Sequence, residues 1–338
     1  MFFYRTVTFI YELRFYQLMA VKIDLKDRRI LYELDLNSRQ SNKQIAKRVG
    51  LSEQVTGNRI KRLMDLGVIE YFYAKTNLLL LGYVHFKIYL RLHNITEQKE
   101  KEMIEELNKQ KGILWLASLR GKYDLVISLN VKNIADFSDR YEELLGKWGE
   151  YILDKDVILL EKGHIYTKSY LLNKESEEII YTKGDEPAKL DETNIKLLRI
   201  LNNRAREQLI EIAKEVGISA DNVRYRMKNL EAQGVLAGYG AKIDYRKLSN
   251  TYSLIFLKLQ NMTKEKQKKF ETLAKANKNI IYLIRTIGDH DIELETETSD
   301  KKEIDLLMRQ FKDAFAQEIK DYEILEVTEE HRLTYYPF

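Results

Sequence analysis

Two short stretches of the chain carry hydrogen-bonding and cationic side chains at helical spacing. One follows Ser52, and the other follows Ser219, 167 positions later. Amide, guanidinium and ammonium groups on the exposed face of a helix can bond base edges and neutralise phosphates. The side chains of this kind are Gln54, Asn58, Arg59, Lys61 and Arg62 in the first stretch and Arg224, Tyr225, Arg226 and Lys228 in the second. This chemistry suits binding to double-stranded DNA.

Two alternatives remain open for these residues. Each stretch can be an ordinary solvated helix face that carries surface charge. Arg59 and Arg226 lie at the edge of the expected buried face, where an arginine can either bond phosphate or brace the fold. The two exposed faces also differ in sequence, so we expect them to prefer different half-sites if both contact bases.

A second pair of signatures consists of the tetrapeptides Gly121-Lys122-Tyr123-Asp124 and Gly288-Asp289-His290-Asp291. Glycine supplies the backbone freedom that a tight turn needs, and aspartate accepts hydrogen bonds from neighbouring amides. These features are typical of a structural hairpin. A turn with a carboxylate can also bind an amino group, which makes this pair a candidate effector site. The candidate effector residues are Gly121, Tyr123, Asp124, Gly288, His290 and Asp291.

The composition argues against several other classes of protein. The 338 residues include no Cys and five scattered His, which leaves no thiolate or common histidine metal motif. Walker, nucleophile-elbow and dinucleotide-binding motifs are also absent. No apolar run approaches the ~20 residues that cross a bilayer. We therefore expect a cytoplasmic protein that is not an enzyme and has no cofactor, metal or membrane partner. The net charge of +4 is too small to indicate DNA binding by itself.

Both stretches belong to a repeat that covers most of the chain. The run Ile45-Ala46-Lys47 matches Ile212-Ala213-Lys214, and Gly67-Val68 matches Gly234-Val235. The same offset relates the two hairpin signatures, without a gap. This register predicts two copies of one folding unit.

Each copy begins with a helix-turn-helix pattern. In the first copy, Ser41 and Ser52 are expected to begin helices, and Gly50 and Gly67 to end them. The apolar period then changes from about 3.6 to 2 at a strand that leads into a wing. The elements expected beyond it are strands at about 83–92, 113–120, 123–131 and 156–162 and helices at about 97–110 and 133–147. This βαββαβ order predicts a ferredoxin-like domain and an α+β fold.

The patterns divide the chain into six segments. They are an N-terminal extension at 1–20, winged helix-turn-helix units at 21–78 and 190–245, ferredoxin-like sensor domains at 79–172 and 246–338, and a linker at 173–189. The extension has two open interpretations. It is either untranslated, with Met19 as the true first residue, or an added strand or docking segment.

Taken together, these motifs resemble those of the Lrp/AsnC regulators, also called feast/famine regulatory proteins. The resemblance covers about 24–162 and 191–328 and rests on the helix-turn-helix and the Gly-x-x-Asp hairpin at the right separation. It implies two regulators fused in tandem, each a winged helix-turn-helix joined to a ferredoxin-like (RAM-type) sensor. It also implies homo-oligomers formed through the sensor domains and amino-acid-like effectors. The chain departs from the family pattern at Thr56, Ser249 and His290.

We therefore expect a sequence-specific transcription regulator whose halves pack as an intramolecular pseudo-dimer. Two rival interpretations remain. Sirohaem decarboxylases resemble the same family in fold and pair two unlike halves, although the hairpins of this chain lack their His/Asn/Tyr-rich sequence. The other rival is a small-molecule sensor that has lost DNA binding.

Overall fold

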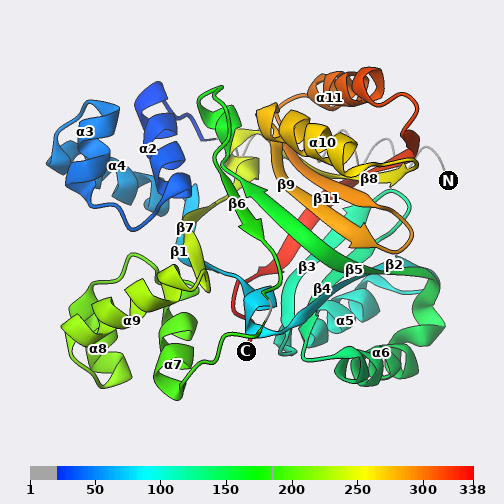
Figure 1. Ribbon diagram of the computed structural model, residues 1–338, viewed down its shortest axis with the longest axis horizontal. Coiled ribbons are helices and arrows are strands. Elements are labelled where there is room, and N and C mark those ends of the chain that lie inside the picture. The colour runs from blue at the N-terminus through cyan, green and yellow to red at the C-terminus, as the bar shows by residue number, and fades with distance from the viewer. Residues whose placement is uncertain (1–20, 185) are drawn as a thin grey trace.

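The two copies form one molecule with the helix-turn-helix units at one end and a sheet structure at the other (Figure 1). The structure, a computed structural model, describes residues 21–184 and 186–338. The expectations for segment 1–20 lie outside the described residues.

The helix-turn-helix units form where the sequence predicts them. The first unit consists of α2 (Leu25–Leu36), α3 (Asn42–Val49) and α4 (Glu53–Asp65), followed by β1 (Ile69–Thr76); the second consists of α7 (Glu192–Leu201), α8 (Leu209–Val216) and α9 (Ala220–Ala232), followed by β7 (Leu236–Ile243). Ser41 begins α3 by accepting a hydrogen bond from the Gln44 amide, and Gly50 ends it at φ 67°. Local capping therefore sets these boundaries.

Each ferredoxin-like domain shows the expected βαββαβ order. The first contains β2 (Val84–Leu92), α5 (Glu97–Lys109), β3 (Ile113–Arg120), β4 (Leu125–Val131), α6 (Ile134–Trp148) and β5 (Ile152–Tyr166). The second contains β8 (Thr251–Leu259), α10 (Lys264–Ala276), β9 (Ile280–Ile287), β10 (Ile292–Thr298), α11 (Lys301–Ala314) and β11 (Ile319–Leu333). The fold class is therefore the predicted one. The last strand of each domain is longer than expected, because it continues into the other copy.

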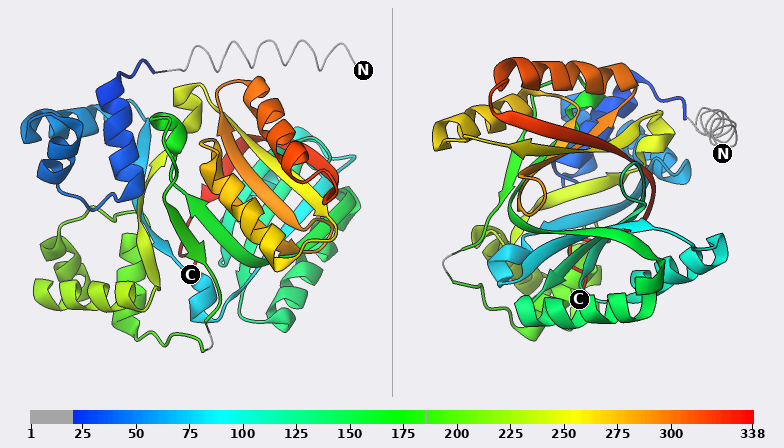
Figure 2. Two further views of the ribbon diagram at one scale, coloured as in Figure 1. Left: turned by 45° about the horizontal axis from the view of Figure 1, so that its top comes forward. Right: turned by 90° about the vertical axis from the view of Figure 1, so that its right-hand side faces the viewer.

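Strands β5 and β11 join the two ferredoxin-like domains into a closed ring of strands. The order is β2-β4-β3-β11-β8-β10-β9-β5, and β5 pairs again with β2. The first part of β5 pairs with β2 and its second part with β9. Strand β11 pairs in the same way with β8 and then with β3. Because each long strand belongs to both sheets, the copies cannot separate without breaking strand pairs. Figure 2 shows this barrel with α5 and α6 outside one wall and α10 and α11 outside the other.

The segment predicted as a linker is partly ordered sheet. Strand β6 (Glu178–Tyr181) pairs antiparallel with β5, from Gly163 opposite Tyr181 to Tyr166 opposite Glu178. A free edge of β5 accepts this strand. The bounds of the linker stay a prediction, with β6 lying inside them.

One apolar core joins the two helix-turn-helix units. Strands β1 and β7 form a two-stranded antiparallel ribbon, from Ile69 opposite Ile243 to Thr76 opposite Leu236. Buried residues of α2, α3 and α4 belong to the same cluster as those of α7, α8 and α9. In place of two separate wings, the strand after each third helix pairs with its counterpart in the other copy. The two units are therefore packed together and not tethered loosely.

Candidate nucleic-acid interface

The third helix of each unit has one buried face and one solvated face. Ser52 accepts a hydrogen bond from the Val55 amide and so begins α4, which buries Thr56, Ile60 and Leu63. Thr56 departs from the family pattern without leaving an unpaired hydroxyl, because its Oγ1 donates to the Ser52 carbonyl oxygen at 2.9 Å. A buried threonine is therefore compatible with this helix.

Helix α9 is built in the same way. Ser219 accepts from the Asn222 amide, and the helix buries Val223, Met227 and Leu230. Both third helices thus present the complementary face to solvent, as a groove-binding helix requires.

Most predicted contact residues lie on those solvated faces. The side chains of Gln54, Asn58, Lys61, Arg224 and Lys228 are exposed. Arg224 pairs along its own helix with Asp221 at 2.6 Å. Tyr225 is 64% exposed, an unusual position for a large aromatic side chain that contacts no core. These residues are free to approach a ligand from solution.

Three of the predicted contact arginines bond to the first helix of their own unit or to its N-cap. Arg59 Nη1 lies 2.8 Å from both Asp24 Oδ2 and Asp27 Oδ1, and Arg62 Nη2 lies 2.5 Å from Asp27 Oδ2. Arg226 Nη1 lies 2.6 Å from Asp191 Oδ2 in the second unit. The structure therefore favours the bracing role for Arg59 and Arg226. For Arg62 it shows a partner that the sequence did not indicate.

The same contacts favour the ionised form of the aspartate at the start of the first helix in each unit. At Asp24, the amide of Asp27 and then the guanidinium of Arg59 lower the pKa of the carboxyl below its ordinary value. At Asp191, the guanidinium of Arg226 and then the Asn194 amide act in the same direction on the pKa. Each arginine thus ties the third helix to the beginning of the first.

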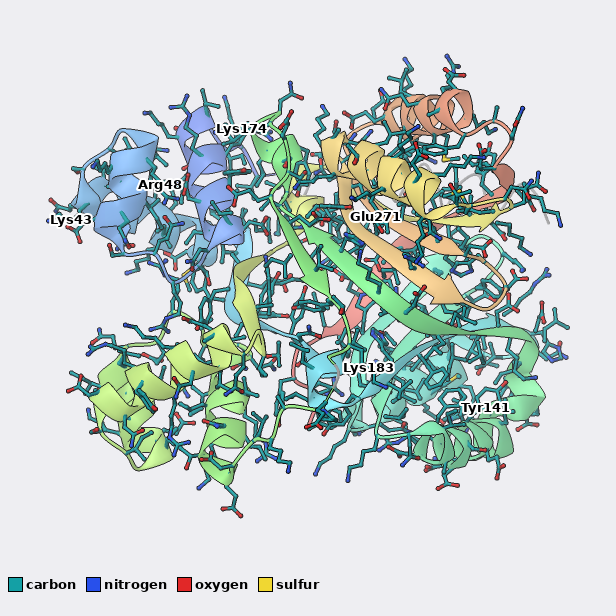
Figure 3. The ribbon with its side chains drawn as sticks, in the orientation of Figure 1. Lys43, Arg48, Tyr141, Lys174, Lys183 and Glu271 are labelled. Atoms are coloured by element: carbon teal, nitrogen blue, oxygen red, sulfur yellow. The ribbon has the colours of Figure 1, made fainter. Side chains whose placement is uncertain are left out.

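A further basic residue on α3 was missed by the sequence reasoning. Lys43 is exposed, and Figure 3 shows it at the end of the first unit that lies far from the barrel. In helix-turn-helix proteins, the helix before the recognition helix crosses the phosphate backbone. The position of Lys43 just after the Ser41 cap is the signal that identifies it.

Lys61 and Lys228 should supply sequence-independent affinity. We expect Lys61→Ala and Lys228→Ala each to reduce the slope of log affinity against log salt by about 1, because each removes one phosphate contact and its released counterion. Fluorescence anisotropy with a labelled duplex over a salt series measures this slope.

Asn58→Ala serves as the matched control on the same helix face. It should leave the salt slope unchanged and alter base preference instead, because an amide contacts base edges without neutralising charge. Unchanged slopes in both lysine variants would remove the phosphate assignment.

Two arginines hold the units against each other by reciprocal contacts. Arg39 Nη1 donates to the Ala205 carbonyl oxygen of the second unit. Its counterpart Arg206 donates to the Gln40 carbonyl oxygen of the first unit at 2.9 Å. Their guanidinium carbons lie 5.8 Å from the Tyr239 ring centroid and 5.3 Å from that of Phe72. We call Arg39 and Arg206 the arginine clasp.

Both guanidinium groups of the arginine clasp are partly removed from solvent. This burial lowers the pKa of both groups below the ordinary arginine value. A desolvated guanidinium that bonds backbone carbonyls gives a specific and directional contact. The clasp therefore links the two units by directional contacts.

The predicted effector hairpins are closed by contacts within the chain. Asp124 Oδ2 accepts from the Leu92 amide at 2.7 Å, and Asp291 Oδ2 accepts from the Leu259 amide at 2.6 Å. These bonds tie each hairpin to the neighbouring strand and favour the structural interpretation of the turns.

The remaining effector candidates also occupy positions that serve the fold. Gly121 and Gly288 have φ values of 142° and 157°, which favour glycine. Tyr123 is buried, and the buried ring of His290 stacks on Phe256 at 4.0 Å between centroids. An effector at the hairpins stays a prediction.

The sequence reasoning missed a charged cluster inside the barrel. Lys87 Nζ lies 2.6 Å from Glu293 Oε1 and 2.8 Å from Glu295 Oε1, and all three side chains are buried. Burial and then the charge of Lys87 lower the pKa of the nearby His85 to about 3. The signal was present in the sequence, because Glu293, Glu295 and Glu297 alternate along one strand and must share one face.

Comparisons with known proteins agree with the helix-turn-helix geometry. A family model for winged helix-turn-helix DNA binding matches residues 23–70, and a model for the AsnC-type helix-turn-helix domain matches residues 190–231. An uncharacterised HTH-type transcriptional regulator of Pyrococcus abyssi is 30% identical over 134 residues, which are 38% of this chain and 89% of that protein. An HTH-type transcriptional regulator of Methanocaldococcus jannaschii is 36% identical over 105 residues, which are 30% of this chain and 68% of that protein.

Two solved structures of one protein cover both copies together. The sirohaem decarboxylase NirDL aligns with a TM-score of 0.61 and 15% identity, covering 93% of this chain and 94% of that chain. At this identity the likeness concerns the fold alone. Within residues 21–184 and 186–338, no helix is long and apolar enough to span a bilayer.

Proposed function

Because the chain belongs to the Lrp/AsnC family of helix-turn-helix transcription regulators, we propose that it binds DNA sequence-specifically with both third helices at once. The observation that supports this most directly is that α4 and α9 pack on one common core and lead into one common ribbon. The β1–β7 ribbon, the common core and the arginine clasp hold the two helices in one rigid unit. A regulator built in this way needs no dimerisation step to present two recognition helices.

The operator should consist of two unlike half-sites. On α4 the exposed N-terminal half offers Gln54 and Asn58, whereas the equivalent positions of α9 are Asp221 and Tyr225. An amide can bond adenine in two places, and an aspartate accepts from cytosine. Half-site preference therefore differs between the copies, and the covalent fusion secures one of each.

Selection of bound duplexes from a random pool tests this proposal. The expected result is an asymmetric motif whose half-sites lie about one helical turn, roughly 34 Å, apart. A variant of α4 that carries the α9 residues at positions 53, 54, 57 and 58 should shift the motif toward a palindrome. Recovery of a perfect palindrome by the unaltered protein would contradict unlike recognition, and recovery of no motif would contradict sequence-specific binding.

An enzymatic function of the sirohaem-decarboxylase kind is the second candidate. It is supported by the likeness across both halves and by a cavity that residues of both halves line. The cavity volume of about 120 Å³ argues against it. Pockets for drug-sized ligands measure about 300–1,000 Å³, and a tetrapyrrole needs a pocket at least of that size. Tetrapyrrole absorbance in the purified protein, or decarboxylation of added sirohaem, would favour the enzyme.

The remaining predictions concern regulation and assembly. We propose a cytoplasmic protein that forms homo-oligomers through the sensor domains and responds to an amino-acid-like effector. Light scattering with and without amino acids measures the assembly. A gel shift against upstream DNA separates the regulator from a sensor that has lost DNA binding.

A further inference from the structure

A cavity lies between the barrel and the β1–β7 ribbon. Its volume is about 120 Å³. Apolar side chains such as Leu114, Ile165 and Ile281 form much of its wall. The ribbon contributes Lys75 and Lys242 to the same lining. Anything bound there touches the element that carries both third helices.

Lys75 and Lys242 occupy equivalent positions in the two copies, but only Lys242 has a carboxylate partner. Lys242 Nζ lies 2.5 Å from Glu330 Oε2, and Glu330 Oε1 accepts a hydrogen bond from Trp115 Nε1 at 3.0 Å. Burial opposes the charge of Lys242, but Glu330 raises its pKa above the ordinary lysine value. In this half of the cavity, the charge of the buried lysine is therefore balanced by a carboxylate.

The residue equivalent to Glu330 in the first copy is Gly163. The strand register supports the equivalence, because Glu330 is opposite Ala117 and Gly163 is opposite Ile284, which are themselves 167 positions apart. Gly163 also lines the cavity. The first copy therefore lacks the carboxylate that the second copy supplies from its own chain.

Lys75 is consequently a buried amine without a carboxylate in ion-pair contact among the described residues. Its side chain is 3% exposed, and Nζ donates to the Asp35 carbonyl oxygen at 3.3 Å. Within the described part of the chain, Nζ forms no ion pair with a carboxylate oxygen within 4.0 Å. Burial lowers the pKa of Lys75. Of the nearby charges, Asp35 favours its protonated form and Lys168 opposes it. An ammonium has three donor hydrogens, so most of its capacity is unused.

Other unused hydrogen-bonding groups line the same cavity. Thr76 Oγ1, Asn130 Nδ2 and Tyr181 OH are buried and have no partner among the described residues. Buried polar groups are normally satisfied, and an unpaired one is destabilising. All three can donate, so the vacant capacity matches an acceptor-rich ligand.

We propose that this cavity binds a short-chain organic carboxylate, whose carboxyl group takes beside Lys75 the place that Glu330 takes beside Lys242. The apolar wall accommodates the hydrocarbon part of the ligand. Binding at this site does not depend on the proposed DNA function. If the protein regulates transcription, the ligand is in contact with the β1–β7 ribbon and is positioned to influence α4 and α9.

Two variants test the site from opposite directions. Lys75→Met removes the ammonium and keeps a side chain of similar length. Gly163→Glu supplies the missing carboxylate from the chain itself. A Cβ at position 163 meets only the Tyr181 Cβ, at 3.8 Å, so the substitution is sterically acceptable at its base. Lys99→Met, on the surface of α5, is the control.

Isothermal titration calorimetry of the full chain with acetate, butyrate, hexanoate and benzoate is the experiment, with butanol, butylamine and leucine as comparison ligands. At least one carboxylate should bind the unaltered protein and the control equally, and bind Lys75→Met and Gly163→Glu at least tenfold more weakly. Proton uptake on binding, seen as a dependence of the enthalpy on the buffer, should disappear in Lys75→Met.

Several outcomes would overturn the proposal. They are no binding of any carboxylate, unchanged affinity in both variants, or equal affinity for butanol. Tighter binding of leucine than of hexanoate, with no effect of either variant, would place the ligand at another site. Because the titration contains no DNA, its failure is distinguishable from failure of the proposed regulator function, which the duplex selection tests separately.

Discussion

Replacing Lys87 with methionine is expected to lower the free energy of unfolding by about 3–5 kcal/mol, because the substitution leaves two buried carboxylates without their cation. Lys87 is 3% exposed and contacts both Glu293 and Glu295 inside the barrel. The hydroxyl of Tyr89 also donates to Glu293 at 2.6 Å, but a neutral donor cannot replace an ammonium. Denaturant unfolding followed by circular dichroism measures the change.

The pH dependence of the variant provides a second readout. In the unaltered protein burial opposes the charge of Lys87, yet Glu293 and Glu295 raise its pKa, so its contribution is present at neutral pH and is lost as pH rises through the folded pKa. Burial likewise opposes ionisation of Glu293, but Lys87 lowers the pKa of Glu293, and that contribution is lost only as pH falls through the folded value. Neither of these two groups changes its ionisation between pH 8 and pH 5, so neither alters the stability in that range. His85, whose folded pKa is lowered, makes the protein less stable as the pH falls, and Glu295, whose pKa burial raises, acts in the opposite direction.

In Lys87→Met the two carboxylates must take up protons to stay buried. The difference in stability from the unaltered protein should consequently narrow as the pH falls from 8 to 5. The control is Lys99→Met, whose lysine is 42% exposed and should contribute less than about 0.5 kcal/mol. Equal loss in both variants, or a difference independent of pH, would contradict a buried ionic cluster.

Removing both members of the arginine clasp is expected to weaken binding to the complete operator by about tenfold, which corresponds to about 1.4 kcal/mol. Arg39→Ala combined with Arg206→Ala deletes the reciprocal bonds between the units. The units then acquire freedom that DNA binding must remove again, and this ordering lowers affinity. Anisotropy titration with the selected operator measures the loss.

Two controls distinguish a loss of relative orientation between the units from misfolding of a unit and from the loss of a positive charge. Affinity for a duplex that contains one half-site should not change, because each unit keeps its own recognition helix. Arg204→Ala should leave operator affinity unchanged, because Arg204 is largely exposed and its side chain pairs only with Glu207 and Glu215 among the described residues. Equal operator affinity for the clasp variant and the unaltered protein would contradict a role of the clasp in orientation.

The amino-acid sequence by itself determined the local elements and their duplication. Apolar period, serine caps and glycine stops predicted the helix-turn-helix units and the βαββαβ order, because these patterns depend on residues a few positions apart. The helix expected at about 97–110 is Glu97–Lys109, and the strand expected at 113–120 is Ile113–Arg120. The exact offset between the copies also indicated which residues are equivalent.

Only the tertiary structure decided which distant residues meet. The strand expected at 156–162 extends over Ile152–Tyr166, because it continues into the sheet of the other copy. The bracing role of Arg59 followed from its contact with Asp24, more than thirty positions away. The lack of a carboxylate beside Lys75 became clear only by comparison with the pair that Lys242 forms with Glu330. Side-chain periodicity specifies an element and its buried face, whereas electrostatic partners depend on how the copies pack.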